Sequence, residues 1–113
     1  MTEIKRGAIF YISNESPNLK SQCEQAGVRP AVVISNNMGN TYSPVVIVAP
    51  LTTKKKKELP THIKTLATGR ASTVLCEQIV TISKERLLGY VASLSDQEIK
   101  ELNRAVSISL GIY

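Results

Sequence analysis

The chain has 113 residues with 42% hydrophobic and 20% charged side chains, which is too apolar a composition for a disordered protein. A chain of this size buries about two thirds of the surface that it exposes when unfolded, so it can form a hydrophobic core. Its longest apolar run, residues 45–51, falls far short of the ~20 residues that cross a bilayer. We therefore expect a single domain over residues 1–113 that is cytoplasmic and has no membrane partner.

The net charge of +5 is unevenly distributed along the chain. Residues 1–57 hold eight Lys and Arg against three Asp and Glu, whereas residues 58–113 hold six of each. This asymmetry favours a polyanion, an acidic peptide or an anionic surface as the partner. A basic protein without a charged partner is the alternative.

Runs of β-branched and aromatic residues between turn residues predict five or six short strands, mostly antiparallel because the connections are short. The predicted strands cover residues 8–12, 31–35, 45–52, 61–65, 73–82 and 88–94, with a turn at 36–40. The polar segment 13–27 between the first two strands is a long loop, of the kind that is functional or mobile. A small curved sheet or open barrel fits this pattern.

The C-terminal segment has the period of a helix. Its apolar residues recur every three or four positions, at Ile99, Leu102, Val106 and Leu110. Ser95 and Glu98 have the spacing of a capping box at its start. A shorter helical turn over residues 84–87 is expected after Ser83.

The first candidate for chemistry is Arg29. It lies between Val28 and Pro30, and the proline holds the preceding backbone extended. A guanidinium on a stiff backbone suits a phosphate, because its planar fork matches the phosphate oxygens. An ion pair with Glu24 at the entrance of a strand is the structural alternative.

A second candidate is Thr52, at the end of the strongest predicted strand, whose hydroxyl suits a phosphoryl oxygen unless it merely ends the strand. The four lysines at positions 54–57 form either phosphate contacts or a solvated turn. His62 is a base reader, an acid–base group or a strand histidine held by a partner. Glu77 interrupts an apolar run and is either solvated or paired, with Arg29 as one partner to consider.

Few residues suit metal or histidine chemistry. Cys23 and Cys76 are the two cysteines, and they have neither C-x-x-C nor zinc-site spacing, so free thiols are expected. A single histidine excludes a two-histidine nuclease within one chain, and no carboxylate cluster resembles a two-metal site. The sequence predicts neither a metal nor a cofactor.

Several short motifs, in matching order and spacing over nearly the whole chain, resemble the MazF/PemK toxins. They are Arg6-Gly7, Glu24-Gln25-x-Gly27-Val28-Arg29-Pro30, Val33-Ile34-Ser35-Asn36, Gly39-Asn40, Ser43-Pro44, Val46-Ile47-Val48-Ala49, Leu51-Thr52, Leu59-Pro60-Thr61-His62, Glu77-Gln78-Ile79 and Thr81-Ile82. Any one of them alone is weak evidence, but their agreement is specific.

The resemblance implies a mainly β fold with a C-terminal helix, an SH3-like small barrel of the MazF/PemK/CcdB type that forms a homodimer. It implies a sequence-specific endoribonuclease toxin of a toxin–antitoxin system that cleaves single-stranded mRNA without a metal. In that chemistry the substrate 2′-hydroxyl attacks the adjacent phosphate and leaves a 2′,3′-cyclic phosphate and a 5′-hydroxyl. The family's catalytic arginine and threonine fall on Arg29 and Thr52, and Glu24 matches an acidic position linked to the site.

The residues expected to bind RNA are Lys54, Lys55, Lys56, Lys57, His62, Gln78, Cys23, Gln25 and Leu51. The resemblance also implies a cognate MazE-like antitoxin whose acidic segment lies across the basic surface. The loop at 13–27 is longer than the common pattern, Cys23 stands where a small hydroxyl residue is often seen, and the segment 64–72 is shorter. The family's base specificity is therefore not transferred.

Two other functions stay open. A non-nuclease toxin of the same fold would bind a protein target such as DNA gyrase through its C-terminal residues, although the Val28-Arg29-Pro30 and Leu51-Thr52 motifs argue against it. An RNA-binding module that does not cleave its ligand is the other. Mapping the ends of RNA fragments distinguishes them.

Overall fold

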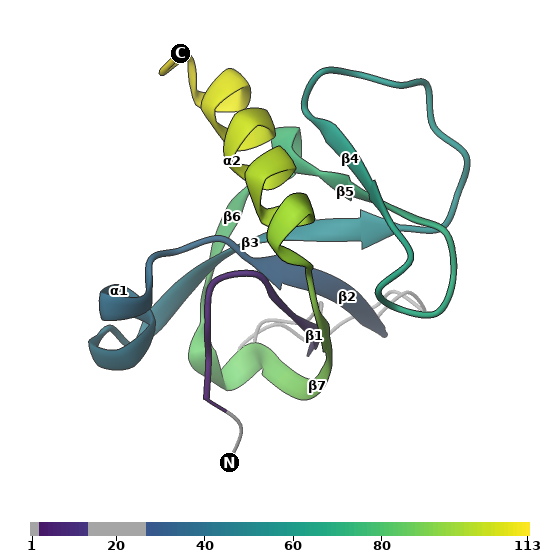
Figure 1. The fold of residues 1–113 in the computed structure, drawn as a ribbon. Coiled ribbons are helices and arrows are strands. Elements are labelled where there is room, and N and C mark those ends of the chain that lie inside the picture. Colours follow the sequence, from purple (N-terminus) through teal and green to yellow (C-terminus); the bar gives the residue numbers. More distant parts are fainter. Residues whose placement is uncertain (1–2, 14–26) are drawn as a thin grey trace.

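The structure, a computed structural model, describes residues 3–13 and 27–113. Its strands are β1 (Ala8–Ser13), β2 (Val28–Val33), β3 (Val45–Thr52), β4 (His62–Thr65), β5 (Ser72–Leu75), β6 (Val80–Ser83) and β7 (Leu87–Ser93). Its helices are α1 (Asn37–Tyr42), α2 (Asp96–Leu110) and the 3-10 turns η1 (Cys76–Gln78) and η2 (Lys84–Arg86). The described chain is thus mainly β with a C-terminal helix, as the sequence predicts (Figure 1).

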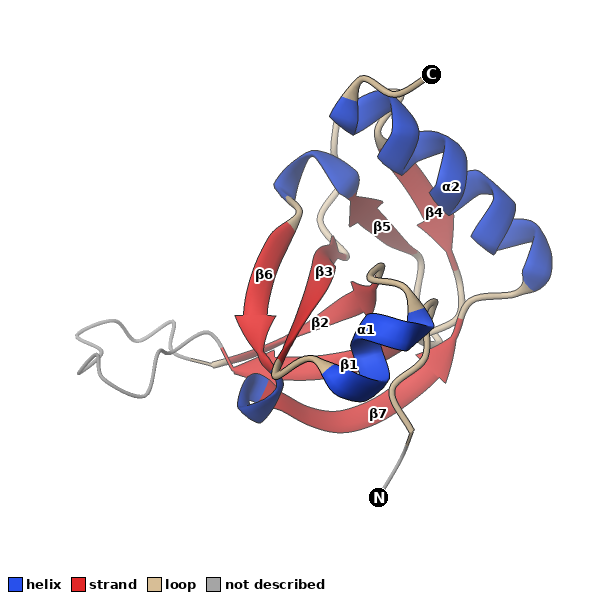
Figure 2. Cartoon of the chain, turned by 90° about the vertical axis from the view of Figure 1, so that its left-hand side faces the viewer, coloured by secondary structure: helices blue, strands red, loops and turns tan. Residues whose placement is uncertain are grey.

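All of the strand pairs are antiparallel, in the order β4-β5-β3-β2-β1-β7, and β6 pairs with β3 as well. The sheet curves strongly without closing, so it forms an open barrel (Figure 2). Strand β3 is central, because β2 pairs with one of its edges and two strands share the other. Val45 to Val48 pair with β6, and Leu51 and Thr52 pair with β5.

The expected strand at 73–82 is wrong, because η1 divides it into β5 and β6. The break has a physical cause in the contacts of the chain around Thr61. The backbone N–H of Cys76 donates to the Thr61 carbonyl at 3.0 Å, and the Glu77 carboxylate accepts hydrogen bonds from Thr61 and His62. These contacts turn the chain between β5, which pairs with the C-terminal end of β3, and β6, which pairs with its N-terminal half.

The expected turn at 36–40 is also wrong, since residues 37–42 form α1. Asn36 caps this helix, and its side-chain oxygen accepts from the Gly39 N–H at 2.8 Å. The buried Asn40 side chain bonds to Ser35, which fixes the helix against the end of β2. The same asparagines that favour turns also favour helix caps, and here the cap prevails.

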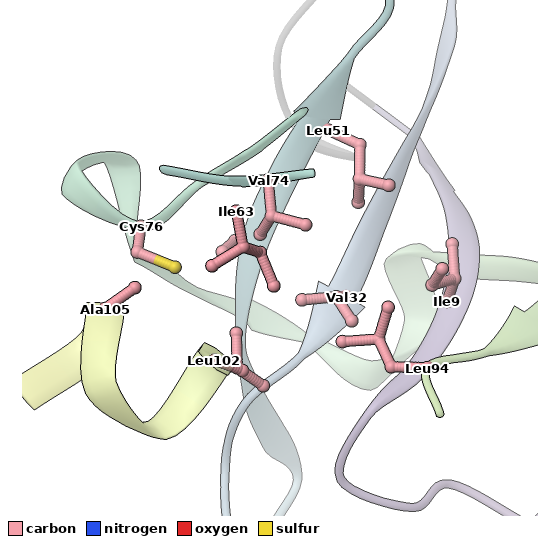
Figure 3. Close-up of a cluster of buried hydrophobic side chains, with 10 residues drawn as sticks. Ile9, Val32, Leu51, Ile63, Val74, Cys76, Leu94, Leu102 and Ala105 are labelled. Carbon is pink, nitrogen blue, oxygen red and sulfur yellow. The ribbon is translucent and has the colours of Figure 1, made fainter. Parts of the chain in front are cut away.

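The central strands bury both faces, and alternate residues enter two hydrophobic clusters. One cluster lies under α2 and contains Ile9, Val32, Ala49, Leu51, Ile63, Val74, Cys76, Leu94, Leu102 and Ala105 (Figure 3). The other contains Ala8, Phe10, Ile12, Ala31, Val33, Val46, Val48 and Ile82. This period of two fixes the register, because a slip of one residue would exchange the two faces.

Helix α2 confirms the C-terminal prediction. Ser95 and Glu98 form the capping box, with reciprocal hydrogen bonds of 3.1 and 2.9 Å to the backbone N–H groups. Gly111, in the left-handed region, ends the helix. The helix packs against β4 and η1, where the Ser109 hydroxyl donates to the Cys76 carbonyl at 2.7 Å. No helix within the two described ranges has the length and apolarity to span a membrane.

Replacing Gly7 tests the packing of α2 on the sheet. Gly7 has a φ of +92°, and an added Cβ would overlap Cδ1 of Ile99 on α2. We expect Gly7→Ala to lower the free energy of unfolding by about 2–3 kcal/mol in urea denaturation. Gly69→Ala is the matched control, because Gly69 has a φ of +89° with nothing within 4 Å of the added Cβ. We expect it to cost about 1 kcal/mol. Equal losses in the two variants would contradict this packing.

Candidate active site

A groove of about 660 Å³ lies where β2 begins and β3 ends. Its volume is within the range of about 300–1,000 Å³ that is typical of ligand sites. We call it the basic groove and define it by Val28, Arg29, Pro30, Leu51, Thr52, Thr53, Lys54, Lys56, Thr68, Arg70, Ser72 and Gln78 among its lining residues. It collects residues from β2, from the end of β3 and the segment after it, from the β4–β5 turn and from η1.

Arg29 lies on β2 rather than in the preceding loop. The predicted strand began at Ala31, but the structure extends it to Val28, and Arg29 pairs with Ile12 of β1. Its backbone is therefore fixed by the sheet. Its side chain is exposed in the basic groove and forms no hydrogen bond or ion pair with the described part of the chain. A fixed, unpaired guanidinium suits an anionic ligand.

Thr52 is the last residue of β3 and shares the basic groove with Arg29. In the register of β2 with β3, Ala31 lies opposite Pro50, and continuing it by two residues puts Arg29 opposite Thr52. Side chains directly opposite on antiparallel strands share a face. The Thr52 hydroxyl oxygen accepts the Lys54 backbone N–H at 3.1 Å, which leaves its O–H free to donate to a ligand.

The lysines that follow β3 differ in their position relative to the groove. Lys54 and Lys56 line the basic groove, while Lys55 joins them along a neighbouring hollow of about 740 Å³. Lys57 is exposed and lines neither of these two. Leu51 touches the groove but is 2% exposed and belongs to the core, so it offers little surface to a ligand.

Gln78 lines the basic groove, and the neighbouring Glu77 does not. The proposed ion pair of Glu77 with Arg29 is wrong. The Glu77 carboxylate instead accepts from the Thr61 hydroxyl at 2.9 Å and bonds the His62 Nε2 at 3.0 Å. These contacts hold η1, and thereby the position of Gln78.

His62 lies away from the groove. Its side chain is 5% exposed, and its Nδ1 is buried without a hydrogen-bond partner. It lines a separate hollow of about 420 Å³ beside α2. The structure therefore does not bring His62 together with Arg29 and Thr52. Of the three roles considered for His62 from the sequence, that of a strand histidine held by a partner fits the geometry.

Three predicted site residues, Cys23, Glu24 and Gln25, lie outside the described residues. The other cysteine, Cys76, is a free thiol in the core, as expected. Burial raises the pKa of Cys76 to about 11, and the nearby Glu77 carboxylate adds to the shift. Such a thiol is protonated and unreactive near neutral pH.

Sequence reasoning missed the β4–β5 turn, which brings Thr68, Arg70 and Ser72 to the groove. The available signal was the Thr68-Gly69-Arg70 sequence, a turn glycine next to a cation. It carried no information about which strand end the turn would reach.

The open barrel with its C-terminal helix and basic groove defines the class of small β toxins with the MazF/CcdB type of fold. The chain belongs to the PemK-like, MazF-like toxin family of type II toxin–antitoxin systems, whose model matches residues 5–110. It is 42% identical over 115 residues to Endoribonuclease MazF of Staphylococcus saprophyticus, covering 97% of this chain and 93% of that one.

Solved structures confirm the fold. A MazE–MazF complex from Deinococcus radiodurans matches with a TM-score of 0.80 at 18% identity, over 100% of both chains. An endoribonuclease in complex with its cognate antitoxin from a mycobacterial species matches with a TM-score of 0.78 at 21% identity, over 96% of both chains.

The contacts of Glu77 predict a pH dependence of stability. Burial acts to raise the pKa of Glu77, but hydrogen bonds from His62, the backbone and Thr61 outweigh it and hold the pKa below its ordinary value. This stabilisation is present above the unfolded pKa of about 4.3 and is lost as the pH falls through the lower folded value.

We therefore expect Glu77→Gln to reduce the fall in the free energy of unfolding on acidification below about pH 5. Urea titrations at several pH values measure it. Glu101→Gln is the control, because Glu101 is an exposed helix residue that forms no ion pair within the described chain. An acid dependence of Glu77→Gln identical to that of the unmodified protein would show that these contacts contribute nothing.

Proposed function

We propose that Arg29 and Thr52 act together on one phosphodiester of a single-stranded RNA bound in the basic groove. The family of the chain and its 42% sequence identity to an endoribonuclease make it an endoribonuclease toxin of a toxin–antitoxin system. The observation that supports the assignment of these two residues is that a guanidinium and a hydroxyl, far apart in sequence, line one groove from adjacent strands.

In the proposed mechanism the substrate 2′-oxygen attacks the adjacent phosphorus, and the bond from phosphorus to the 5′-oxygen breaks. The products are a 2′,3′-cyclic phosphate and a 5′-hydroxyl. Arg29 stabilises the negative charge that develops on the phosphate oxygens, and the Thr52 O–H donates to a non-bridging oxygen. Glu24 takes the proton of the 2′-hydroxyl or orients Arg29, and the departing 5′-oxygen gains a proton, for which Arg29 is the candidate donor.

The lysines after β3 supply affinity rather than sequence reading in this proposal. Lysine contacts to phosphates carry no base information, whereas hydrogen-bonding groups at base edges do. Gln78 is the described residue in the groove best suited to read a base, because its amide both donates and accepts.

The proposed partners follow from charge and from the sheet. An acidic segment of a MazE-like antitoxin would occupy the basic groove and exclude RNA. We also propose a cytoplasmic homodimer of the single domain over residues 1–113. The edges of an open sheet leave strand N–H and C=O groups for pairing, which a second copy can cover.

Removing either proposed catalytic group tests the mechanism. We expect Arg29→Ala and Thr52→Ala each to lower the cleavage rate by about 10²–10³, the loss typical for one preorganised donor to a developing charge. Arg104→Ala is the control, since Arg104 is exposed on α2 and lines the hollow beside it instead of the basic groove. Cleavage by the unmodified protein should persist in EDTA. Full activity of Arg29→Ala would overturn the assignment.

The ends of the RNA products separate the functions that the sequence left open. Incubation of the purified protein with a long RNA should yield fragments with 5′-hydroxyl ends at a short recurring base motif. An intact RNA with reduced electrophoretic mobility would indicate a binding module. The absence of both cleavage and binding would favour a toxin with a protein target. Either of these results would contradict the proposed function.

The lysine run has its own test, in the salt dependence of RNA binding. We expect replacement of Lys54 and Lys56 by Gln to reduce the slope of log K against log salt by about 0.7 for each phosphate that the protein no longer neutralises. The cleavage motif should not change, because these lysines do not read bases. Replacement of Lys100 on α2, which lines none of the three hollows described above, is the control. An unchanged slope in the lysine variants would make the run a solvated loop.

A further inference from the structure

The β4–β5 turn brings a second guanidinium to the basic groove. Arg70 lies in the connection between Thr65, which ends β4, and Ser72, which begins β5. The turn and the chain that follows β3 leave the sheet on the same side (Figure 1). Arg70 and Lys54 accordingly line one groove with Arg29.

The backbone around Arg70 is fixed by local hydrogen bonds. Its carbonyl accepts from the Thr68 hydroxyl at 3.2 Å and from the Ser72 hydroxyl at 3.1 Å. The Gly69 N–H donates to the Leu66 carbonyl at 2.9 Å, and Gly69 has a φ of +89°, which an L side chain rarely adopts. Arg70 therefore extends from a constrained turn, and a ligand need not order its backbone.

Two properties together distinguish Arg70, its lack of partners within the described chain and its place in the groove. Arg104 is also exposed and unpaired among the described residues, but it lines the hollow beside α2. Arg6 donates to the Ile34 carbonyl at 2.9 Å, and Arg86 donates twice to the Ser13 carbonyl, so both are used within the fold. Arg70 is exposed and forms no side-chain hydrogen bond or ion pair with any described residue, as is also true of Arg29. The two arginines in the groove are thus free to bind an anion.

We propose that Arg70 binds an RNA phosphate that flanks the cleaved one, so that the β4–β5 turn and β2 hold the strand at two phosphates. This inference rests on the proposed function. A guanidinium matches two oxygens of a phosphate with parallel hydrogen bonds, and it positions the strand without reading a base. An acidic antitoxin side chain is the competing ligand, and RNA is favoured because the groove also holds the proposed catalytic pair.

Binding to an RNA that cannot be cleaved tests the proposal independently of catalysis. The probe is an oligonucleotide that spans a mapped cleavage site, with a 2′-deoxy sugar in place of the attacking 2′-hydroxyl. We expect Arg70→Gln to weaken its binding about tenfold and to reduce the salt slope by about 0.7. Arg104→Gln is the control, because Arg104 lines the hollow beside α2, and it should leave the affinity and the salt slope unchanged. Equal affinities of Arg70→Gln and Arg104→Gln would overturn the proposal.

A scan of neutral phosphates locates the contact. Replacing one phosphate at a time by methylphosphonate should weaken binding to the unmodified protein at one flanking position, and that penalty should disappear in Arg70→Gln. Thr68→Val keeps the guanidinium but removes a hydroxyl that holds the Arg70 backbone. The loss of binding caused by methylphosphonate at the same position should therefore be smaller in Thr68→Val than in the unmodified protein. The same penalties at every position in the unmodified protein and in Arg70→Gln would contradict a specific contact.

Two further outcomes separate this proposal from its alternatives. If Arg70→Gln binds the RNA normally but loses affinity for a synthetic acidic peptide, then Arg70 serves a protein ligand and the proposal is wrong. If Arg29→Ala cleaves at the normal rate while the methylphosphonate penalty still depends on Arg70, then the catalytic assignment fails and the phosphate contact stands. On the cleavable RNA, Arg70→Gln should raise KM and leave kcat within about twofold, because Arg70 holds the substrate equally in the ground state and the transition state.

Discussion

The pairing of β2 with β3 is the constraint on which the site depends. Ala31 lies opposite Pro50, and this register extended toward the strand ends puts Arg29 across from Thr52. The register is enforced by burial, since the neighbouring positions on the same strands fill two separate clusters on opposite faces. Where the strands leave the core, the alternation continues but apolar side chains are replaced by a cation and a hydroxyl. The proposed active site is therefore an extension of the pattern that folds the sheet.

The remaining parts of the groove reach it by different routes. Gln78 is placed by η1, which is held in turn by the bonds of Glu77 to Thr61 and His62 and by Ser109 of α2. The β4–β5 turn is held by hydroxyl groups that bond its own backbone. Helix α2 forms no wall of the groove, but its packing on η1 fixes an element that does, through Gln78. Loss of the contact between α2 and η1 should thus affect RNA binding by displacing Gln78, whereas the exposed residues of α2 do not touch the groove.

The elements that sequence reasoning located correctly are those set by local chemistry. β3 has the predicted bounds, residues 45–52, because an apolar run rich in β-branched residues begins after Ser43-Pro44 and stops before the lysines at 54–57, and α2 begins at its capping box. The break at η1 could not be seen locally, since it depends on Thr61 and His62 in a different strand connection. Arg29 and Thr52 were predicted from their chemistry and from resemblance to a toxin family, and the structure places both in one groove. Arg70 was missed because its place depends on the direction in which a distant turn folds.

Arg29 and Thr52 are proposed to serve a single phosphodiester, and the proposed enzyme mechanism depends on this arrangement. A double-mutant cycle on the single-turnover cleavage rate tests it most directly, with Arg29→Ala, Thr52→Ala and the double variant. Groups that act as a unit are strongly non-additive, so we expect the double variant to be little slower than Arg29→Ala alone. Full additivity of the two increases in the free energy of activation would contradict a shared phosphodiester.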